Sequence, residues 1–183
     1  HNFHTHKFNK GDLYYDCELT RQGVTLVDTP GADSINARHT GVAFDYIKNS
    51  DAILFVTYYN HAFSKADQEF LIQLGRVKDS FQLDKMFFII NAIDLADNEE
   101  EKNNVVDYVK ENLIKYGVRN PHLYPLSSLA ALQEKTERLS LLSGMKDFEQ
   151  AFYNFINNDL ANIAVRAADN ELVRVHNLLT GLV

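Results

Sequence analysis

Two short apolar runs constrain the fold of this chain most, because each is suited to a strand buried on both faces. The runs cover residues 52–58 (AILFVTY) and 85–90 (KMFFII), and a helical pattern over residues 64–77 separates them. Buried strands that alternate with helices are typical of a parallel sheet with helices on its faces. The alternation therefore predicts an α/β domain with a mainly parallel sheet and flanking helices.

Further segments extend this pattern in both directions. Residues 13–19 and 24–27 are rich in β-forming side chains, and the Thr20-Arg21-Gln22-Gly23 segment between them predicts the turn of an antiparallel hairpin. The remaining elements expected before the last third are a helix around residues 37–49, a helix over 98–116 and a strand over 122–126. From Met145 to Leu179 apolar residues recur at three and four positions, which predicts helices whose apolar stripe outlasts the sheet and needs a partner.

Composition narrows the class of function. The 183 residues are 45% hydrophobic, enough for one domain with a sizeable core, and the net charge of −7 provides no basic field for nucleic acid. No run approaches the roughly 20 apolar residues of a transmembrane helix. The single cysteine, Cys17, cannot form an internal disulfide, which fits a reducing cytoplasm. His1, His4 and His6 are candidate metal ligands, but they do not complete a zinc set and suit an unstructured lead-in better.

An acid and a glycine follow the predicted strand over residues 24–27. The sequence VTLVDTPG places Asp28 at the end of this strand and Gly31 three residues further on. A carboxylate at this point can hold a hydrated Mg²⁺, and a glycine lets a backbone N–H approach a terminal phosphate closely. The pattern predicts a nucleotide switch, although an ordinary Thr-Pro-Gly turn after a strand would have the same sequence.

A second acid follows the next buried strand. Asn91-Ala92-Ile93-Asp94 directs the Asp94 carboxylate toward whatever lies over the strand ends, where ligands of parallel sheets bind. A carboxylate accepts two hydrogen bonds, and guanine offers the adjacent N1–H and N2–H₂ donors, which adenine lacks. We therefore expect Asp94 to select guanine, although an N-x-x-D string is also frequent by chance.

Together the two elements resemble the third and fourth motifs of GTPases, and Ser127-Ser128-Leu129 lies where the guanine-contacting loop of the fifth motif belongs. From Tyr14 to about Ala131 the chain closely resembles the GTPase domain of bacterial dynamin-like proteins, in particular one head of the tandem, double-headed bacterial dynamins. The resemblance rests on VTLVDTPGADSINARHT, DAILFVTYYNHAFSKADQEFL, FFIINAIDLAD and LYPLSSLAAL.

That resemblance implies an incomplete Ras-like sheet, GTP or GDP with Mg²⁺, and self-association through the GTPase head. It also implies a helical bundle after the head, and a role in membrane fusion or repair as a cytoplasmic protein peripheral to the inner face of the cell membrane. The expected organisation is a loop over residues 1–10, a partial dynamin-type GTPase domain over 11–157, and over 158–183 a helix that leads into the bundle.

The resemblance also assigns nucleotide-contacting roles to residues of this sequence that match the family motifs. The resemblance makes Asp28 the acid linked to Mg²⁺ through water and Gly31 the γ-phosphate sensor. Asn91, Asp94 and Ser127 become the residues around the base.

The resemblance also assigns nucleotide-contacting roles to two further acids, and for each of them helix capping is an alternative role. The resemblance makes Asp97 a second acid at the base, but Asp97 could equally be the N-cap of the following helix. Asp67 aligns with the acid that contacts the nucleotide of the opposing head, in trans. The alternative is that Ser64 caps the helix and Asp67 supports that cap.

Two departures from the family pattern bear on activity. The fourth motif usually has a lysine whose stem covers the base, and this chain has Ala92 there. None of its eight glycines precedes a lysine, so the phosphate-binding GxxxxGK[ST] motif is absent from the 183 residues. We expect the chain to begin downstream of that motif and of the switch I threonine, and therefore assign it no catalytic residue.

Three functions remain under consideration. The first is a GTP-hydrolysing head, and the second is a non-catalytic pseudo-GTPase head that acts as a dimerisation or interaction module. A ParA-like ATPase ranks last because it gives no reason for the second acid. If the strand before the phosphate-binding loop is missing, we expect another chain in its place, a rearranged sheet, or a hairpin over residues 13–27 detached from the parallel strands.

Overall fold

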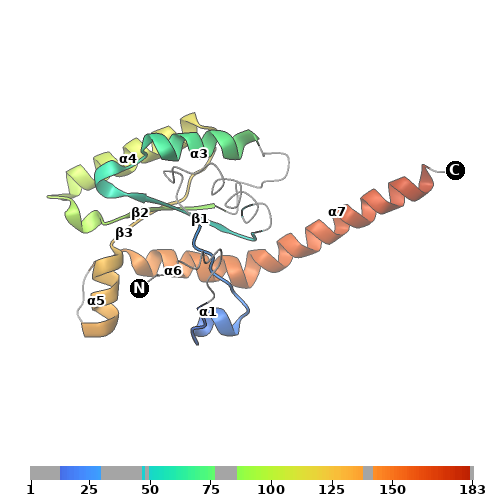
Figure 1. The fold of residues 1–183 in the computed structure, drawn as a ribbon, viewed down its shortest axis with the longest axis horizontal. Helices are drawn as coiled ribbons and strands as arrows, with labels where there is room; N and C mark the ends of the chain where they lie inside the picture. The colour runs from blue at the N-terminus through green and yellow to red at the C-terminus, as the bar shows by residue number, and fades with distance from the viewer. Residues whose placement is uncertain (1–12, 30–46, 48–49, 77–85, 138–141, 182–183) are drawn as a thin grey trace, which may run out of the picture.

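The computed structural model describes residues 13–29, 47, 50–76, 86–137 and 142–181. Its centre is a three-stranded sheet in the order β1-β2-β3 (Figure 1). The strands are β1 (Ile53–Tyr58), β2 (Met86–Asn91) and β3 (Leu123–Leu126), and both strand pairs are parallel. The predicted parallel α/β arrangement is confirmed.

The register brings the carboxyl ends of the three strands level. Tyr58 at the end of β1 lies opposite Asn91 of β2, and Asn91 in turn lies opposite Leu126 of β3. Loops that leave these positions therefore begin side by side along one edge of the sheet. The 3-10 turns η1 (Tyr59–His61) and η4 (Ile93–Leu95) follow β1 and β2 directly.

Helices α3 (Lys65–Arg76) and α4 (Glu99–Lys115) cover one face of the sheet (Figure 1). They bury Phe88 and Ile90 of β2 together with Val109 and Leu113 of α4. The helix α4 begins at Asn98, whose side chain accepts a hydrogen bond from the Glu101 N–H at 2.9 Å, and three glutamates in its first turn complement the helix dipole. Both helices lie within the predicted ranges.

The opposite face of the sheet packs against α6 (Met145–Asn154) and the π-helical turn η5 (Phe155–Asp159) that continues it. Phe87 of β2 is the centre of this second core. Its ring meets those of Phe152 and Phe155 edge-on at centroid separations of 5.4 and 5.5 Å. Because successive residues of a strand point to opposite faces, β2 contributes to both cores and is buried from Met86 to Ile90.

β1 differs from the prediction that both its faces are buried. Ile53, Phe55 and Thr57 are buried, whereas Leu54, Val56 and Tyr58 are 36%, 55% and 47% exposed. β1 is an edge strand of the described sheet, and the aromatic cluster around Phe87 covers β2 and β3 without extending over the outer face of β1. The prediction of a strand in residues 52–58 is confirmed, but the prediction that both faces of this strand are buried is wrong.

The predicted hairpin over residues 13–27 is wrong. The segment contains a short helix, α1 (Glu18–Arg21), and no strand. Gly23 ends this helix with φ +83°, its N–H donates to the Thr20 carbonyl at 3.1 Å, and the Val24 N–H donates to the Leu19 carbonyl at 3.0 Å. This pair of hydrogen bonds is the Schellman motif, so the glycine that we interpreted as part of a β-turn is the left-handed residue directly after the helix C-cap, Gln22.

Local polar contacts explain why α1 forms. The Thr20 hydroxyl accepts from the Cys17 N–H at 3.0 Å, and Arg21 forms two hydrogen bonds of 2.8 Å with the Asp16 carboxylate. A two-stranded hairpin without a sheet to join is marginally stable. The 13–29 segment is detached from the described sheet, as one of the three expected arrangements had it, although it is not a hairpin, and β1 has no second neighbour among the described residues. The expectation of another chain beside β1 stays a prediction.

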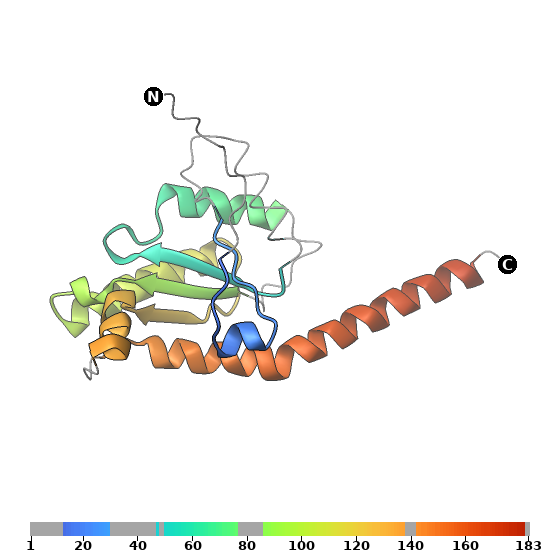
Figure 2. The same cartoon turned by 60° about the horizontal axis from the view of Figure 1, so that its bottom comes forward.

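The last third of the described chain is helical, as predicted. After β3 come α5 (Ser128–Glu137), then α6 with η5, and finally α7 (Leu160–Thr180), which projects away from the body (Figure 2). Among the α7 side chains that the structure describes, the large apolar ones that are exposed are Val165, Leu172, Val173, Val175, Leu178 and Leu179. The expected partner for this stripe remains a prediction, and the expected helix around residues 37–49 lies outside the described residues apart from Ile47, which is helical.

Among the residues that the structure describes, no helix combines the length and the apolar character needed to cross a bilayer.

Phe87→Ala should destabilise the fold by about 3–5 kcal/mol, because it removes the ring at the centre of the second core and leaves a cavity. Chemical denaturation followed by circular dichroism measures the loss. Leu142→Ala is the control: Leu142 is 100% exposed, so its truncation should change stability by less than about 0.5 kcal/mol. Equal effects of the two variants would contradict the assignment of Phe87 as the centre of this core.

Candidate functional site

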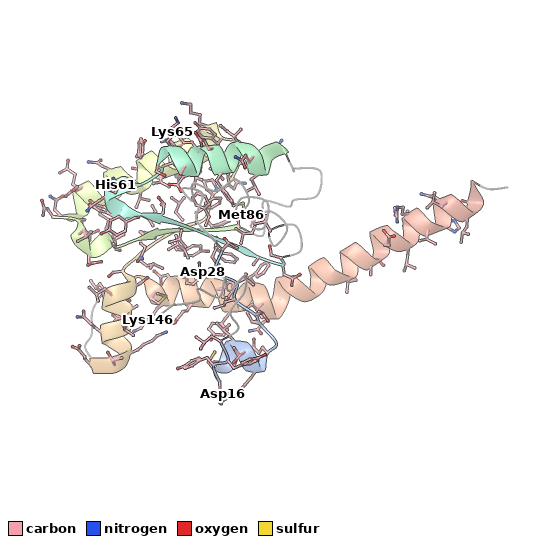
Figure 3. All side chains as sticks on the ribbon, in the orientation of Figure 1. Asp16, Asp28, His61, Lys65, Met86 and Lys146 are labelled. Carbon is pink, nitrogen blue, oxygen red and sulfur yellow. The ribbon has the colours of Figure 1, made fainter. Side chains whose placement is uncertain are left out.

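The candidate site lies along the carboxyl ends of β1, β2 and β3. Figure 3 labels His61, the last residue of η1, at this edge. Asn91 occupies the middle position and is the first polar residue after five buried apolar ones in β2. Its position between the two outer strands gives its side chain access to the loops that follow β2 and β3.

The Asn91 side chain joins these two loops. Its Oδ1 accepts hydrogen bonds from the Ala92 N–H at 2.9 Å and from the Ser128 N–H at 3.0 Å. Ala92 is left-handed, with φ +66°, a conformation uncommon for a residue with a Cβ, and the Asn91 bond to its N–H helps to hold it. One amide oxygen thus couples the turn that carries Asp94 to the start of α5.

Asp94 is exposed on η4 and makes no hydrogen bond to any other residue that the structure describes. The turn under it is closed by hydrogen bonds from the Leu95 N–H to the Ala92 carbonyl and from the Ala96 N–H to the Ile93 carbonyl, both 3.1 Å. The carboxylate is therefore held on an ordered turn at the strand ends and remains available to a ligand.

Asp97 is not the N-cap of α4, so this alternative is wrong: the cap is Asn98. Asp97 precedes the cap, its side chain is exposed, and its N–H donates to the Glu101 Oε2 at 3.0 Å. Glu101 lies at the third position of the helix and reaches back past the cap. The Asp97 carboxylate therefore remains available beside Asp94.

Ser127 lies where the sequence placed it, but its side chain caps a helix. Its Oγ accepts from the Ala130 N–H at 3.1 Å at the start of α5, its own N–H donates to the Ser143 carbonyl at 2.8 Å, and the residue is only 2% exposed. Its contact with a base stays a prediction.

Asp67 and Ser64 form the reciprocal capping pair that the sequence offered as the alternative for Asp67. The Ser64 N–H donates to the Asp67 Oδ2 at 2.8 Å, and the Asp67 N–H donates to the Ser64 Oγ at 3.3 Å. The buried Thr57 hydroxyl also donates to this Oδ2 at 3.2 Å and accepts from the Phe63 N–H at 3.1 Å. Phe63 has φ +60° and is buried, so this network holds a strained loop closed at the end of β1.

Asp28 lies apart from the strand ends, where the residues predicted to contact the base are found. It is exposed, the segment before it is not a strand, and Figure 3 labels it well away from His61 at the strand ends. Gly31 lies outside the described residues, as do His1, His4 and His6. The structure thus brings Asn91, Asp94, Asp97 and Ser127 to one edge of the sheet and does not bring Asp28 to them.

Sequence reasoning missed three residues that shape this edge. Thr57 is the one polar residue within the run 52–58, and that polarity was its signal. Tyr59 is 5% exposed directly after β1, which nothing in the sequence indicated. Gly144 has φ +72°, and a Cβ on it would lie 2.4 Å from the Pro125 carbonyl oxygen, so only glycine lets this turn pack on β3.

The three strand ends are level, and the Asn91 amide joins two of the loops that follow them. These features define an α/β protein with a candidate ligand site at the carboxyl edge of its sheet. Comparison with known proteins identifies the family. The model of the "Dynamin family" matches residues 3–93. Dynamin-like protein A of Bacillus subtilis is 54% identical over 125 residues, which are 68% of this chain and 10% of that protein.

Two more distant relatives agree. The probable transmembrane GTPase FZO-like, chloroplastic, of Arabidopsis thaliana is 30% identical over 144 residues, covering 76% of this chain and 15% of that protein. A solved chain of an oligomerised bacterial dynamin pair matches with a TM-score of 0.61 at 22% identity, covering 84% of this chain and 28% of that one. The chain belongs to the dynamin family and has a dynamin-type GTPase fold. It spans a small part of the length of each of these relatives.

Gly144→Ala should destabilise the protein by at least about 2 kcal/mol, because it adds a backbone clash to the cost of a left-handed alanine. Thermal or urea unfolding measures the change. Gly23→Ala is a matched control, since Gly23 also has a positive φ, +83°, but a Cβ there meets nothing within 4 Å. The control should lose only about 1 kcal/mol, and a loss as large as that of Gly144→Ala would show that the contact with Pro125 contributes nothing.

Proposed function

We propose that this chain forms the guanine-recognising part of the GTPase head of a dynamin-like membrane-remodelling protein. The observation that carries the proposal is the Asn91 amide, which joins the loops after β2 and β3 and holds the exposed Asp94 on an ordered turn. Family membership and the dynamin-type fold support guanine as the base.

Asp94 recognises guanine through the two donors on the edge of the base. Its carboxylate accepts from N1–H and N2–H₂ at once, an arrangement that adenine cannot satisfy. Asp97, also exposed and near the same turn, contacts the nucleotide from a second side. Ser127 contributes through its place in the loop after β3, because its hydroxyl already caps α5.

Mg²⁺ and the phosphates belong to the other end of the nucleotide. Asp28 fits a Mg²⁺ role because its carboxylate is exposed, and Mg²⁺ commonly binds one or two carboxylates together with waters and phosphate oxygens. When bound, the ion supplies charge that stabilises the phosphates during transfer. Asp28 would hold it through water, and Gly31 would sense the γ-phosphate. Asp67 would contact the nucleotide of an opposing head through the carboxylate oxygen that its capping contacts leave unused.

Hydrolysis by the whole protein is the leading form of this proposal, with water attacking the γ-phosphate in line. The alternative is a pseudo-GTPase head that binds nucleotide or a partner without turnover. Ala92 favours the alternative, since it provides no stem to cover the base. In either form the head self-associates, in keeping with the oligomerised bacterial dynamin pair that it resembles in fold.

The cellular role that we propose is membrane remodelling, in fusion, repair or tethering, by a cytoplasmic protein that reaches the inner face of the cell membrane through other segments. Support comes from the solved dynamin pair, which is described as sensing and tethering membranes over long range, and from the dynamin-like relative of Bacillus subtilis.

Asp94→Asn in the full-length protein should lower affinity for GDP by about tenfold or more. The change places an amide donor against guanine donors, which costs about 1–3 kcal/mol. The same variant should gain affinity for xanthosine diphosphate, whose carbonyl at C2 accepts from the new amide. Fluorescence titration with labelled nucleotides measures both constants.

The matched control for this experiment is Asp107→Asn on the exposed side of α4, which removes the same charge away from the strand ends. It should leave both nucleotide affinities unchanged. Unchanged GDP affinity in Asp94→Asn, with no gain for the xanthine nucleotide, would show that Asp94 does not read the base.

The printed 183-residue chain should not hydrolyse GTP by itself. The phosphate-binding motif that supplies much of the binding and transition-state stabilisation is absent from this sequence. Phosphate release from the purified chain, compared with the same preparation carrying Asp94→Asn, measures turnover. Activity in the first that is lost in the second would contradict the prediction.

A further inference from the structure

Tyr59 is a buried polar residue for which the fold and the proposed function give no role. It is the first residue of η1, directly after β1, and is 5% exposed. Its hydroxyl has no partner in hydrogen-bonding geometry among the described residues. A buried hydroxyl left unpaired costs about 1–3 kcal/mol, and such groups in native proteins call for an explanation.

The surroundings of Tyr59 supply a candidate acceptor. The turn η1 packs against η4, which carries Asp94. The pKa of Tyr59 lies above its ordinary value, first because the hydroxyl is buried and then because the Glu101 carboxylate and, more weakly, the Asp97 charge lie near it. A nearby carboxylate favours the protonated phenol, so Glu101 is the candidate acceptor for the unpaired hydroxyl.

Glu101 already holds the loop after β2. Its Oε2 accepts the Asp97 N–H at 3.0 Å, and its own N–H donates to the Asn98 side chain at 2.9 Å. Whatever fixes the Glu101 carboxylate therefore fixes the end of the segment that carries Asp94 and Asp97. Tyr59 belongs to η1, the turn that packs against η4, and is a candidate to do so.

We propose that Tyr59 is a positioning residue for base recognition: its hydroxyl donates to Glu101 when guanine nucleotide is bound and so orients the 92–98 segment. The inference rests on the proposed function and adds a residue that positions the segment carrying Asp94. Bonds of this kind are often loose without ligand and tighten in the complex. The proposed hydrogen bond between Tyr59 and Glu101 would also join the turn that carries Asp94 to the loop after β1, which Thr57 and Asp67 hold closed.

Tyr59→Phe in the full-length protein tests the proposal by nucleotide selectivity. IDP lacks the N2 amino group of GDP, so the ratio of the IDP and GDP dissociation constants reports how well Asp94 meets that group. We expect the variant to bind GDP more weakly by about tenfold or more, as for loss of one hydrogen bond to a charged group, while IDP binding falls less. A variant that was merely less folded would weaken both nucleotides equally and leave the ratio unchanged.

Matched variants separate the outcomes. Tyr108→Phe, an exposed tyrosine on α4, should leave the ratio as in the wild type. Glu101→Gln keeps an acceptor and should retain most of the selectivity, whereas Glu101→Ala should lose it and show no further loss when combined with Tyr59→Phe. Selectivity in Tyr59→Phe equal to that of the Tyr108 control overturns the positioning role. Failure of the wild type to bind GDP would instead overturn the proposed function.

Hydrogen exchange of the GDP-bound full-length protein gives a second readout, which does not depend on the ratio of dissociation constants. Peptides covering residues 92–101 should exchange faster in Tyr59→Phe than in Tyr108→Phe, because the Asp97 N–H depends on a fixed Glu101. Equal exchange in the two variants would also count against the proposal.

Discussion

The burial of β2 on both faces is the constraint on which the rest of the structure depends. Alternate side chains of this strand enter different cores: Phe88 and Ile90 pack under α3 and α4, while Phe87 packs against α6 and η5. Two layers must therefore cover the central strand before its backbone is protected from water. Asn91 is the point at which this burial ends, and the polar edge of the molecule begins there.

Polar side chains at this edge divide into those that build it and those that remain available. Asn91, Ser127 and Asp67 are committed to backbone N–H groups of neighbouring turns and helices. Asp94 and Asp97 are exposed on a segment that these contacts and Glu101 keep in place. Such a division is what a recognition site requires, because a carboxylate can meet a base with little loss of entropy only if its support is already ordered.

The corrected elements share one physical cause. A β-rich segment such as residues 24–27 forms a strand only when it pairs with a neighbouring strand, and it pairs with no strand of the described sheet. Local contacts then decide, and Thr20, Arg21 and Gly23 favour a capped helix over a hairpin. β1 kept its predicted position because β2 pairs with it along its length, but the covering of its outer face depends on distant segments.

The sequence by itself determined the parallel strands, the helices between them and the acid Asp94 after β2, because periodicity and short apolar runs are local properties. Only the tertiary structure decided how the side chains at that edge are used. Asn91 could be assigned to the junction of two loops only once Ser128 was known to lie beside it, 37 positions along the chain. The roles of Tyr59, Glu101 and Gly144 could likewise be assigned only from the tertiary structure, since burial and close packing depend on which segments meet in space.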